Sequence, residues 1–147
     1  MNKLILIIIL LSGILSCEKN DPDYRDNYTG NYTFMIEKIS RTLTGDVFVM
    51  RYDTSFYTGS VKKATSPDEI AVNWSNDSID IEGGASLDRS HTIMTIDENG
   101  NLDCDVNDDA FWKPAYIHSD TIRFTFYCGK GMAHKLWIEW NVTGLKN

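Results

Sequence analysis

The sequence predicts an all-β protein with a single domain, folded as an antiparallel meander. From Tyr28 onward, short segments rich in Val, Ile, Thr, Tyr, Phe and Trp alternate with polar residues, and Gly, Asn, Asp or Pro interrupt them. No long window has the 3.6-residue apolar period of an amphipathic helix. The links between segments are too short for parallel crossovers, which need a dozen or more residues, so neighbouring strands should run antiparallel.

Ten segments are candidate strands, and three of them show a clear alternation of apolar and polar side chains. In chain order the candidates are Asn31–Ser40, Asp46–Tyr52, Phe56–Lys63, Glu69–Asn73, Ser78–Glu82, His91–Ile96, Leu102–Val106, Ala115–His118, Thr121–Cys128 and Ala133–Thr143. The alternating apolar sets are Tyr32, Phe34 and Ile36, then Ile70, Val72 and Trp74, then Ile122, Phe124, Phe126 and Cys128. Such alternation predicts one buried and one wetter face for each strand.

The turn around Gly100 can be predicted in detail. A three-residue loop with Gly100 in the left-handed conformation pairs Ile96 with Leu102, an apolar match, and places Cys104 on a core face. A two-residue loop would instead pair Ile96 with Asp103. Because a slip of one residue moves every side chain to the opposite face, the apolar match favours the three-residue loop.

Motifs that carry catalysis or bind cofactors do not occur in the sequence. It has no Gly-x-Ser-x-Gly elbow, no His-Glu-x-x-His helix and no phosphate-binding loop. A calcium loop counted from Asp97 fails, since Leu102 and Asp108 stand where Gly and Glu are required. The three histidines lie far apart, and we interpret them as surface residues rather than metal ligands: His91, His118 and His134. We therefore expect no enzyme activity, no metal site and no cofactor.

Two groups of aromatic residues are the best indication of a binding role. Phe111 and Trp112 follow a pair of aspartates in an expected loop, where they would line the mouth of a barrel and stack on a sugar or apolar ligand. The alternative is that Trp112 folds back and caps the core. Trp137 and Trp140 lie on opposite faces of the last strand, so at most one of them should belong to the core.

The amino terminus has the pattern of an export signal. Lys3 precedes the apolar run Leu4–Leu11, which is too short to span a bilayer. The following Ile14–Cys17 resembles the lipobox of bacterial lipoproteins, which implies cleavage before Cys17 and fatty acylation of Cys17, a palmitate-type anchor. The alternative is an ordinary signal peptide with a chance cysteine. We expect a signal peptide at residues 1–16, a lipidated cysteine and flexible tether at 17–27, and the β domain at 28–147.

Charge and cysteine content narrow the class of partner. The chain has a net charge of −7 and no long basic cluster, which argues against nucleic acid as a ligand. Membrane attachment must then come from the lipid, since anionic headgroups would repel this surface. In an oxidising compartment Cys104 and Cys128 are expected to form a disulfide, with two buried thiols as the alternative.

Short motifs at both ends of the domain resemble small lipoproteins common in Bacteroidota. They are Tyr24-Arg25-Asp26 with Tyr28–Phe34 at the start and Val142–Lys146 at the end. The resemblance implies a lipocalin-like barrel of about eight strands, with Gly30-Asn31-Tyr32 in the place of the lipocalin Gly-x-Trp. It also implies an outer-membrane location, on either the periplasmic or the surface-exposed face.

The function expected from the sequence is that of a cell-envelope lipoprotein that binds a small ligand or glycan without catalysis, through Phe111 and Trp112. The alternative is a structural or interaction accessory of an outer-membrane protein complex, with a filled core. The sequence leaves open whether the barrel interior is an open cavity or a packed core.

Overall fold

The computed structural model describes residues 22–75, 78–81, 85–88, 92–104, 111–128 and 136–147. For residues 78–81, 85–88, 111–113, 128 and 136 the description covers the backbone and not the side chain. A short 3₁₀ helix, η1 (Tyr24–Asn27), precedes the strands β1 (Gly30–Thr44), β2 (Val47–Lys63), β3 (Glu69–Asn73), β4 (Ser78–Ile81), β5 (Ala85–Asp88), β6 (Thr92–Ile96), β7 (Leu102–Asp103), β8 (Phe111–His118), β9 (Thr121–Cys128) and β10 (Leu136–Lys146). Within these ranges no helix is long and apolar enough to cross a membrane.

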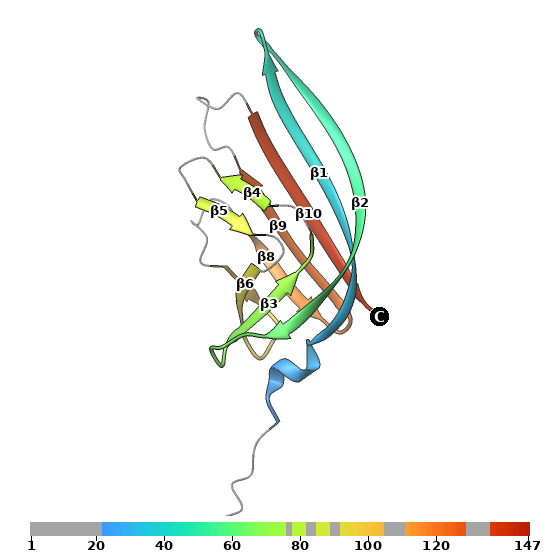
Figure 1. The fold of residues 1–147 in the computed structure, drawn as a ribbon, viewed down its shortest axis with the longest axis vertical. Coiled ribbons are helices and arrows are strands. Elements are labelled where there is room, and N and C mark those ends of the chain that lie inside the picture. The colour runs from blue at the N-terminus through green and yellow to red at the C-terminus, as the bar shows by residue number, and fades with distance from the viewer. Residues whose placement is uncertain (1–21, 76–77, 82–84, 89–91, 105–110, 129–135) are drawn as a thin grey trace, which may run out of the picture.

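Eight of the ten described strands form one antiparallel sheet that nearly closes into a barrel, as predicted. The sheet has eight strands in the order β7-β6-β3-β2-β1-β10-β9-β8, and β4 and β5 form a separate two-stranded sheet (Figure 1). The first long strand pairs with the last, from Tyr32↔Lys146 to Thr42↔Leu136. The two outer strands approach each other where Ile117 N donates a hydrogen bond of 2.7 Å to Gly100 O. Near closure leaves few free strand edges, which favours a stable small sheet.

The predicted turn at Gly100 is confirmed. Gly100 has φ 82°, and Ile96 pairs with Leu102 across the β6–β7 hairpin. The Asp97 carboxylate accepts hydrogen bonds from the backbone N–H of Asn99 at 2.9 Å and of Asn101 at 2.8 Å. These bonds hold the loop in the register that the apolar match predicted.

The predicted break between the second and third candidate strands is wrong. β2 is one strand of 17 residues that pairs with β1 without interruption from Thr44↔Val47 to Gly30↔Val61. Gly45, with φ 63°, occupies the first position of the two-residue turn, where a positive φ is needed. The resulting β1–β2 hairpin projects beyond the rest of the barrel (Figure 1).

The expected loop at Phe111 and Trp112 is also wrong. Both residues belong to β8, where they pair with Phe126 and Thr125 of β9. The pairing register shifts between Trp112 and Tyr116, which is where Pro114 lies. A proline cannot donate a ladder hydrogen bond, so an irregularity at this position lets the edge strand continue through it.

The barrel interior is packed with aromatic and aliphatic side chains from every predicted alternating set. Trp74 is fully buried, stacks on Phe126 with ring centroids 5.8 Å apart, and meets Phe124 edge-on at 5.4 Å. Tyr32 and Phe34 stack beside them at 5.8 Å. Burial raises the pKa of Tyr32 to about 12. The other buried core residues are Ile36, Val61, Ile70, Val72, Met94, Ile96, Leu102, Cys104, Ala115, Ile117, Ile122, Trp140 and Val142.

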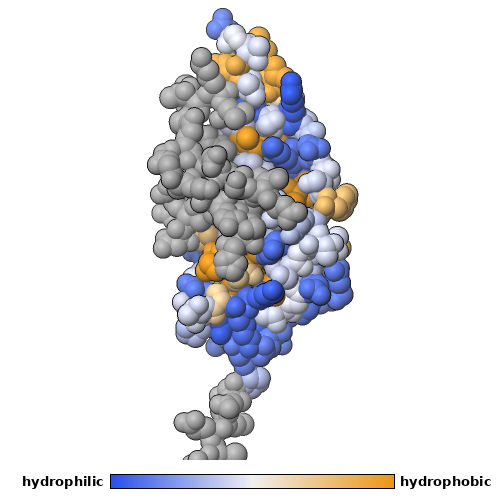
Figure 2. Space-filling view, in the orientation of Figure 1, coloured by the Kyte–Doolittle hydropathy of each residue, from blue (hydrophilic) through white to orange (hydrophobic). Residues whose placement is uncertain are grey.

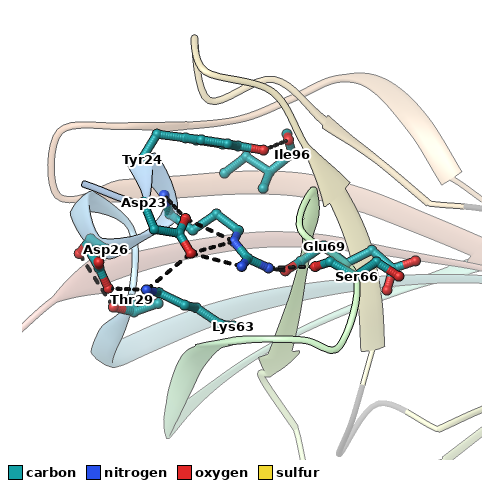
Figure 3. Close-up of polar contacts among 9 residues, drawn as sticks. Asp23, Tyr24, Asp26, Thr29, Lys63, Ser66, Glu69 and Ile96 are labelled. Carbon is teal, nitrogen blue, oxygen red and sulfur yellow. Dashed lines mark hydrogen bonds and ion pairs between the residues drawn. The ribbon is translucent and has the colours of Figure 1, made fainter. Parts of the chain in front are cut away.

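The expected tether ends earlier than Asn27, because η1 packs against one end of the barrel. Asp23 caps this helix, and the buried Arg25 donates to Asp23 Oδ1 at 3.0 Å and Oδ2 at 2.8 Å (Figure 3). Arg25 also donates to the Glu69 carbonyl at 3.0 Å, while Lys63 Nζ lies 2.6 Å from Asp26 Oδ1. The guanidinium hydrogen bonds hold the pKa of Asp23 well below its usual range. We call this set of contacts the N-terminal clamp.

Candidate functional site

The sequence left open whether the barrel interior is a cavity or a packed core, and the described residues favour a packed core. The described core residues that face inward are almost fully buried and contact one another, with Trp74, Tyr32, Phe34 and Phe126 each at most 1% exposed. The indole N–H of Trp74 donates to Thr92 Oγ1 at 3.1 Å, so the polar atom of the largest core side chain is satisfied within the core. The described part of the barrel is therefore a packed core.

The predicted site residues fall partly outside what the structure describes. Cys17 lies outside the described residues, as do the side chains of Phe111, Trp112 and Cys128. Cys104 is buried, and its Sγ donates a hydrogen bond to Ile93 O at 3.3 Å. In the structure Cys104 is a thiol and not part of a disulfide, while the side chain of Cys128 lies outside the described residues. The Cys104–Cys128 disulfide and ligand stacking by Phe111 and Trp112 stay predictions.

A surface pocket of about 720 Å³ lies beside the β6–β7 hairpin. Apolar and acidic side chains line it together: Tyr24, Asp68, Thr95, Ile96, Asp97, Glu98, Asn101, Leu102, Asp103, Pro114 and Ala115. Tyr24 closes one side by donating its hydroxyl to Ile96 O at 2.8 Å (Figure 3). Hydrogen bonds from Asn101 lower the pKa of Asp97, so this carboxylate is engaged in stabilising the β6–β7 turn. Among the described residues, no group of His, Cys, Asp and Glu side chains is placed to hold a metal ion.

The second candidate surface is the outer side of the β1–β2 hairpin. Val61 points into the core, so the odd-numbered residues of β2 face inward and the even-numbered ones face outward. The outward apolar residues are highly exposed: Phe48 58%, Met50 43%, Tyr52 71% and Phe56 71%. We call these four residues the hairpin face.

The hairpin face continues across the sheet to β10 through Arg41. The Arg41 guanidinium lies 6.0 Å from the ring centre of Phe48 and 5.1 Å from that of Trp137. Trp137 is half-buried and Trp140 belongs to the core, in agreement with the prediction that at most one of the two is a core residue. In Figure 2, hydrophobic residues gather at the upper end of the molecule, where Figure 1 places the hairpin tip.

Sequence reasoning did not identify the hairpin face, although the sequence contained a signal for it. Val47–Met50 is a run of four apolar residues inside a candidate strand, rather than an alternation. An apolar run predicts a strand buried on both faces, whereas all four residues are more than 40% exposed. An uninterrupted apolar run on a strand that the domain itself does not cover indicates a contact surface.

Comparison with models of protein families, with curated proteins and with solved structures finds no match for this chain.

Proposed function

We propose that this protein is a non-catalytic interaction module of the cell envelope, anchored to the outer membrane through Cys17, and that it binds other proteins through the hairpin face. The observation that supports this proposal is the contrast between the packed barrel interior and the exposed hairpin. A binding protein of the barrel type needs a cavity of several hundred Å³. Here the large side chains that would surround such a cavity fill it instead.

The composition of the hairpin also supports a protein partner. Of the eight large apolar residues that are exposed in the described structure, six lie on β2 between Val47 and Phe56. Phe, Tyr, Met and Arg are the residue types enriched in the centres of protein interfaces. Monomeric proteins seldom expose a contiguous apolar patch of this kind without a partner.

Photo-crosslinking in intact cells tests the contact surface. A photoreactive phenylalanine analogue at Met50 should form covalent adducts with other protein chains. The same analogue at Arg123, an exposed position on β9, is the matched control and should form few. Equal adduct yields at the two positions, or no adduct from Met50, would contradict the proposed contact surface.

The anchor has a test of its own. Cys17→Ser should prevent acylation and release the protein from membranes into the soluble fraction, because in this proposal the acyl chains on Cys17 are what holds the protein to the membrane. Mass spectrometry of the wild-type protein should find the added acyl mass on the peptide that begins at Cys17. A cleaved Cys17→Ser product that stays in the membrane fraction would count against the lipid anchor.

The surface pocket supports a second candidate function, the binding of a small ligand. Its volume of about 720 Å³ is in the range of known small-molecule sites. Thr95 is exposed and lines this pocket, so Thr95→Trp would fill it from the rim. A glycan or apolar compound that raises the melting temperature of the wild type should have no effect on Thr95→Trp. Equal effects on both proteins would place that compound elsewhere.

A further inference from the structure

The hairpin carries an open strand edge as well as an open face. β1 pairs with β2 along its whole length, but β3 pairs with β2 only from Ser60 to Lys63. From Val47 to Gly59, no described strand pairs with the other edge of β2. The carbonyl of Asn73, the last residue of β3, reaches the backbone of Gly59, where an added Cβ would lie 1.9 Å from that oxygen. The open edge is therefore bounded by the hairpin turn at one end and by β3 at the other.

The hydrogen-bonding groups on this edge come from the even-numbered residues. Ala64 N donates to Glu69 O on the β3 side, at 3.1 Å. Because backbone groups point alternately to the two edges of a strand, and β2 pairs with β1 without a register shift, the even-numbered residues from Phe48 to Phe56 also point to that side. Their N–H and C=O groups form a template for another strand.

Apart from two charged side chains, the described part of this edge lacks the features that normally prevent strand pairing. Proteins protect open edges with proline, lysine, bulges or a covering element. The segment Val47–Gly59 contains no proline and no lysine, and its pairing with β1 is regular throughout. Its only charged side chains are Arg51 and Asp53, and both are exposed.

The sequence of the edge is complementary to itself when reversed. Centred on Tyr52, Phe48–Phe56 reads Phe-Val-Met-Arg-Tyr-Asp-Thr-Ser-Phe. In an antiparallel pair of two such segments, Arg51 of each chain lies opposite Asp53 of the other. Phe48 then lies opposite Phe56, and the two Tyr52 residues lie opposite each other. Opposite charges and aromatic pairs directly across a sheet both stabilise it.

We infer that two copies of this chain pair through this edge, antiparallel and with a twofold axis at Tyr52. The pairs in this register that exchange backbone hydrogen bonds are those of Phe48, Met50 and Tyr52 with Phe56, Thr54 and Tyr52 of the second copy, which are the residues whose backbone groups face the open edge. Val47 then lies opposite Tyr57. The turn of each copy therefore lies beside residues of the other copy that precede Ser60, the residue at which the pairing of β2 with β3 begins. A second copy is thus the occupant that matches the edge in length, hydrogen-bonding pattern and charge.

This inference rests on the proposed function, and it names the first partner of the hairpin. The pairing joins the two β1–β2 hairpins into one four-stranded sheet. The hairpin faces of both copies then form one continuous apolar surface, which stays available to further proteins. The interface is isologous, as in most homodimers.

A charge exchange tests both the partner and the register. The mass of the full chain in detergent, measured by sedimentation, should be that of two chains for the wild type. Arg51→Asp places two like-charged pairs across the interface, and so does Asp53→Arg, and each variant should sediment as one chain. The double variant Arg51→Asp/Asp53→Arg restores both opposite-charge pairs and should again sediment as two chains. Circular dichroism checks that each variant keeps its strand content, as expected for exposed positions.

A proline at the axis tests the edge itself. The backbone N–H of Tyr52 points away from β1, so Tyr52→Pro should keep the β1–β2 hairpin and abolish the two-chain mass. A wild type that sediments as one chain at all concentrations would overturn the inference, and so would a two-chain mass that the single charge variants and Tyr52→Pro leave unchanged. If the wild type is a single chain while the Met50 crosslink captures a different protein, the inference fails and the proposed function stands. If the wild type is a single chain and Met50 forms no adduct, both fail.

Discussion

Replacing Trp74 by alanine is the most direct test of the packed interior. Trp74 is fully buried, and its ring contacts Phe124 and Phe126 with centroids 5.4 and 5.8 Å away. Removing a buried aromatic side chain of this size costs about 3–5 kcal/mol, because the transfer free energy is lost and a cavity remains. The two aromatic contacts raise the expected loss above the lower end of that range, since each contributes about 0.5–1.5 kcal/mol beyond burial. We expect the free energy of unfolding to fall by about 4 kcal/mol.

Urea unfolding of the full chain, followed by circular dichroism, measures this loss as a lower midpoint at an unchanged slope. Leu145→Ala is the matched control, because Leu145 is 56% exposed and its removal should change the free energy by no more than about 0.5 kcal/mol. If Trp74→Ala lowered the free energy of unfolding by less than about 1 kcal/mol, Trp74 would not be packed as described. The barrel interior would then have to be considered again as a ligand cavity.

Three further predictions follow from the backbone, the N-terminal clamp and the cysteines. Gly59→Ala should lower the free energy of unfolding by about 1–3 kcal/mol, because the new methyl group would lie 1.9 Å from the Asn73 carbonyl oxygen and both are fixed to the backbone of a strand. Urea unfolding measures this loss, and an unchanged midpoint would refute the close approach. The pKa of Asp23 is lowered by the Arg25 guanidinium, so its stabilising contribution is complete above the unfolded pKa of about 3.9 and is lost as the pH falls below that value. Asp23→Asn should therefore flatten the dependence of melting temperature on pH between about pH 4 and pH 2, and curves of equal slope would speak against the clamp. Mass spectrometry of the non-reduced protein should find Cys104 and Cys128 linked, and alkylation of both without reductant would exclude that disulfide.

The sequence was a good guide wherever one strand face is buried and the other is wet. The alternation of Tyr32, Phe34 and Ile36 predicted their burial, and the bounds of β3 and β9 agree with the predicted segments. The register at Gly100 was also predictable, because the wrong loop length would have placed Asp103 opposite Ile96. In these places local pattern and tertiary packing favour the same structure.

The errors fall where that agreement is lost. Asp53–Ser55 is polar and resembles a turn, yet it lies in the middle of β2 and pairs with Ile36, Glu37 and Lys38 of β1. Both faces of β2 are exposed there, so no alternation marks the strand. Sequence reasoning correctly expects a strand to bury one face, and the hairpin does not do so within a single chain.

The N-terminal clamp was missed for a different reason. Its sequence is polar and has little to bury, which is typical of a linker. The segment is ordered instead by Arg25, which bonds to carbonyl groups 41 and 44 residues later in the chain, at Ser66 and Glu69. Contacts between residues so far apart in sequence leave no local pattern. The hairpin face could be predicted in part. The sequence shows the apolar run Val47–Met50, but not that these residues are exposed.

The N-terminal clamp and the hairpin tip lie at opposite ends of the molecule (Figure 1), and this separation sets the reach of the protein. β1 has 15 residues at about 3.3 Å each, so it spans about 50 Å from the end of the clamp to the turn. With the anchor that we propose at Cys17, the hairpin is held far beyond the lipid headgroups. Antiparallel pairing at Tyr52 turns the second copy upside down, so the two anchors point away from each other. Such a pair would connect two membrane surfaces that face one another, with one copy anchored in each membrane.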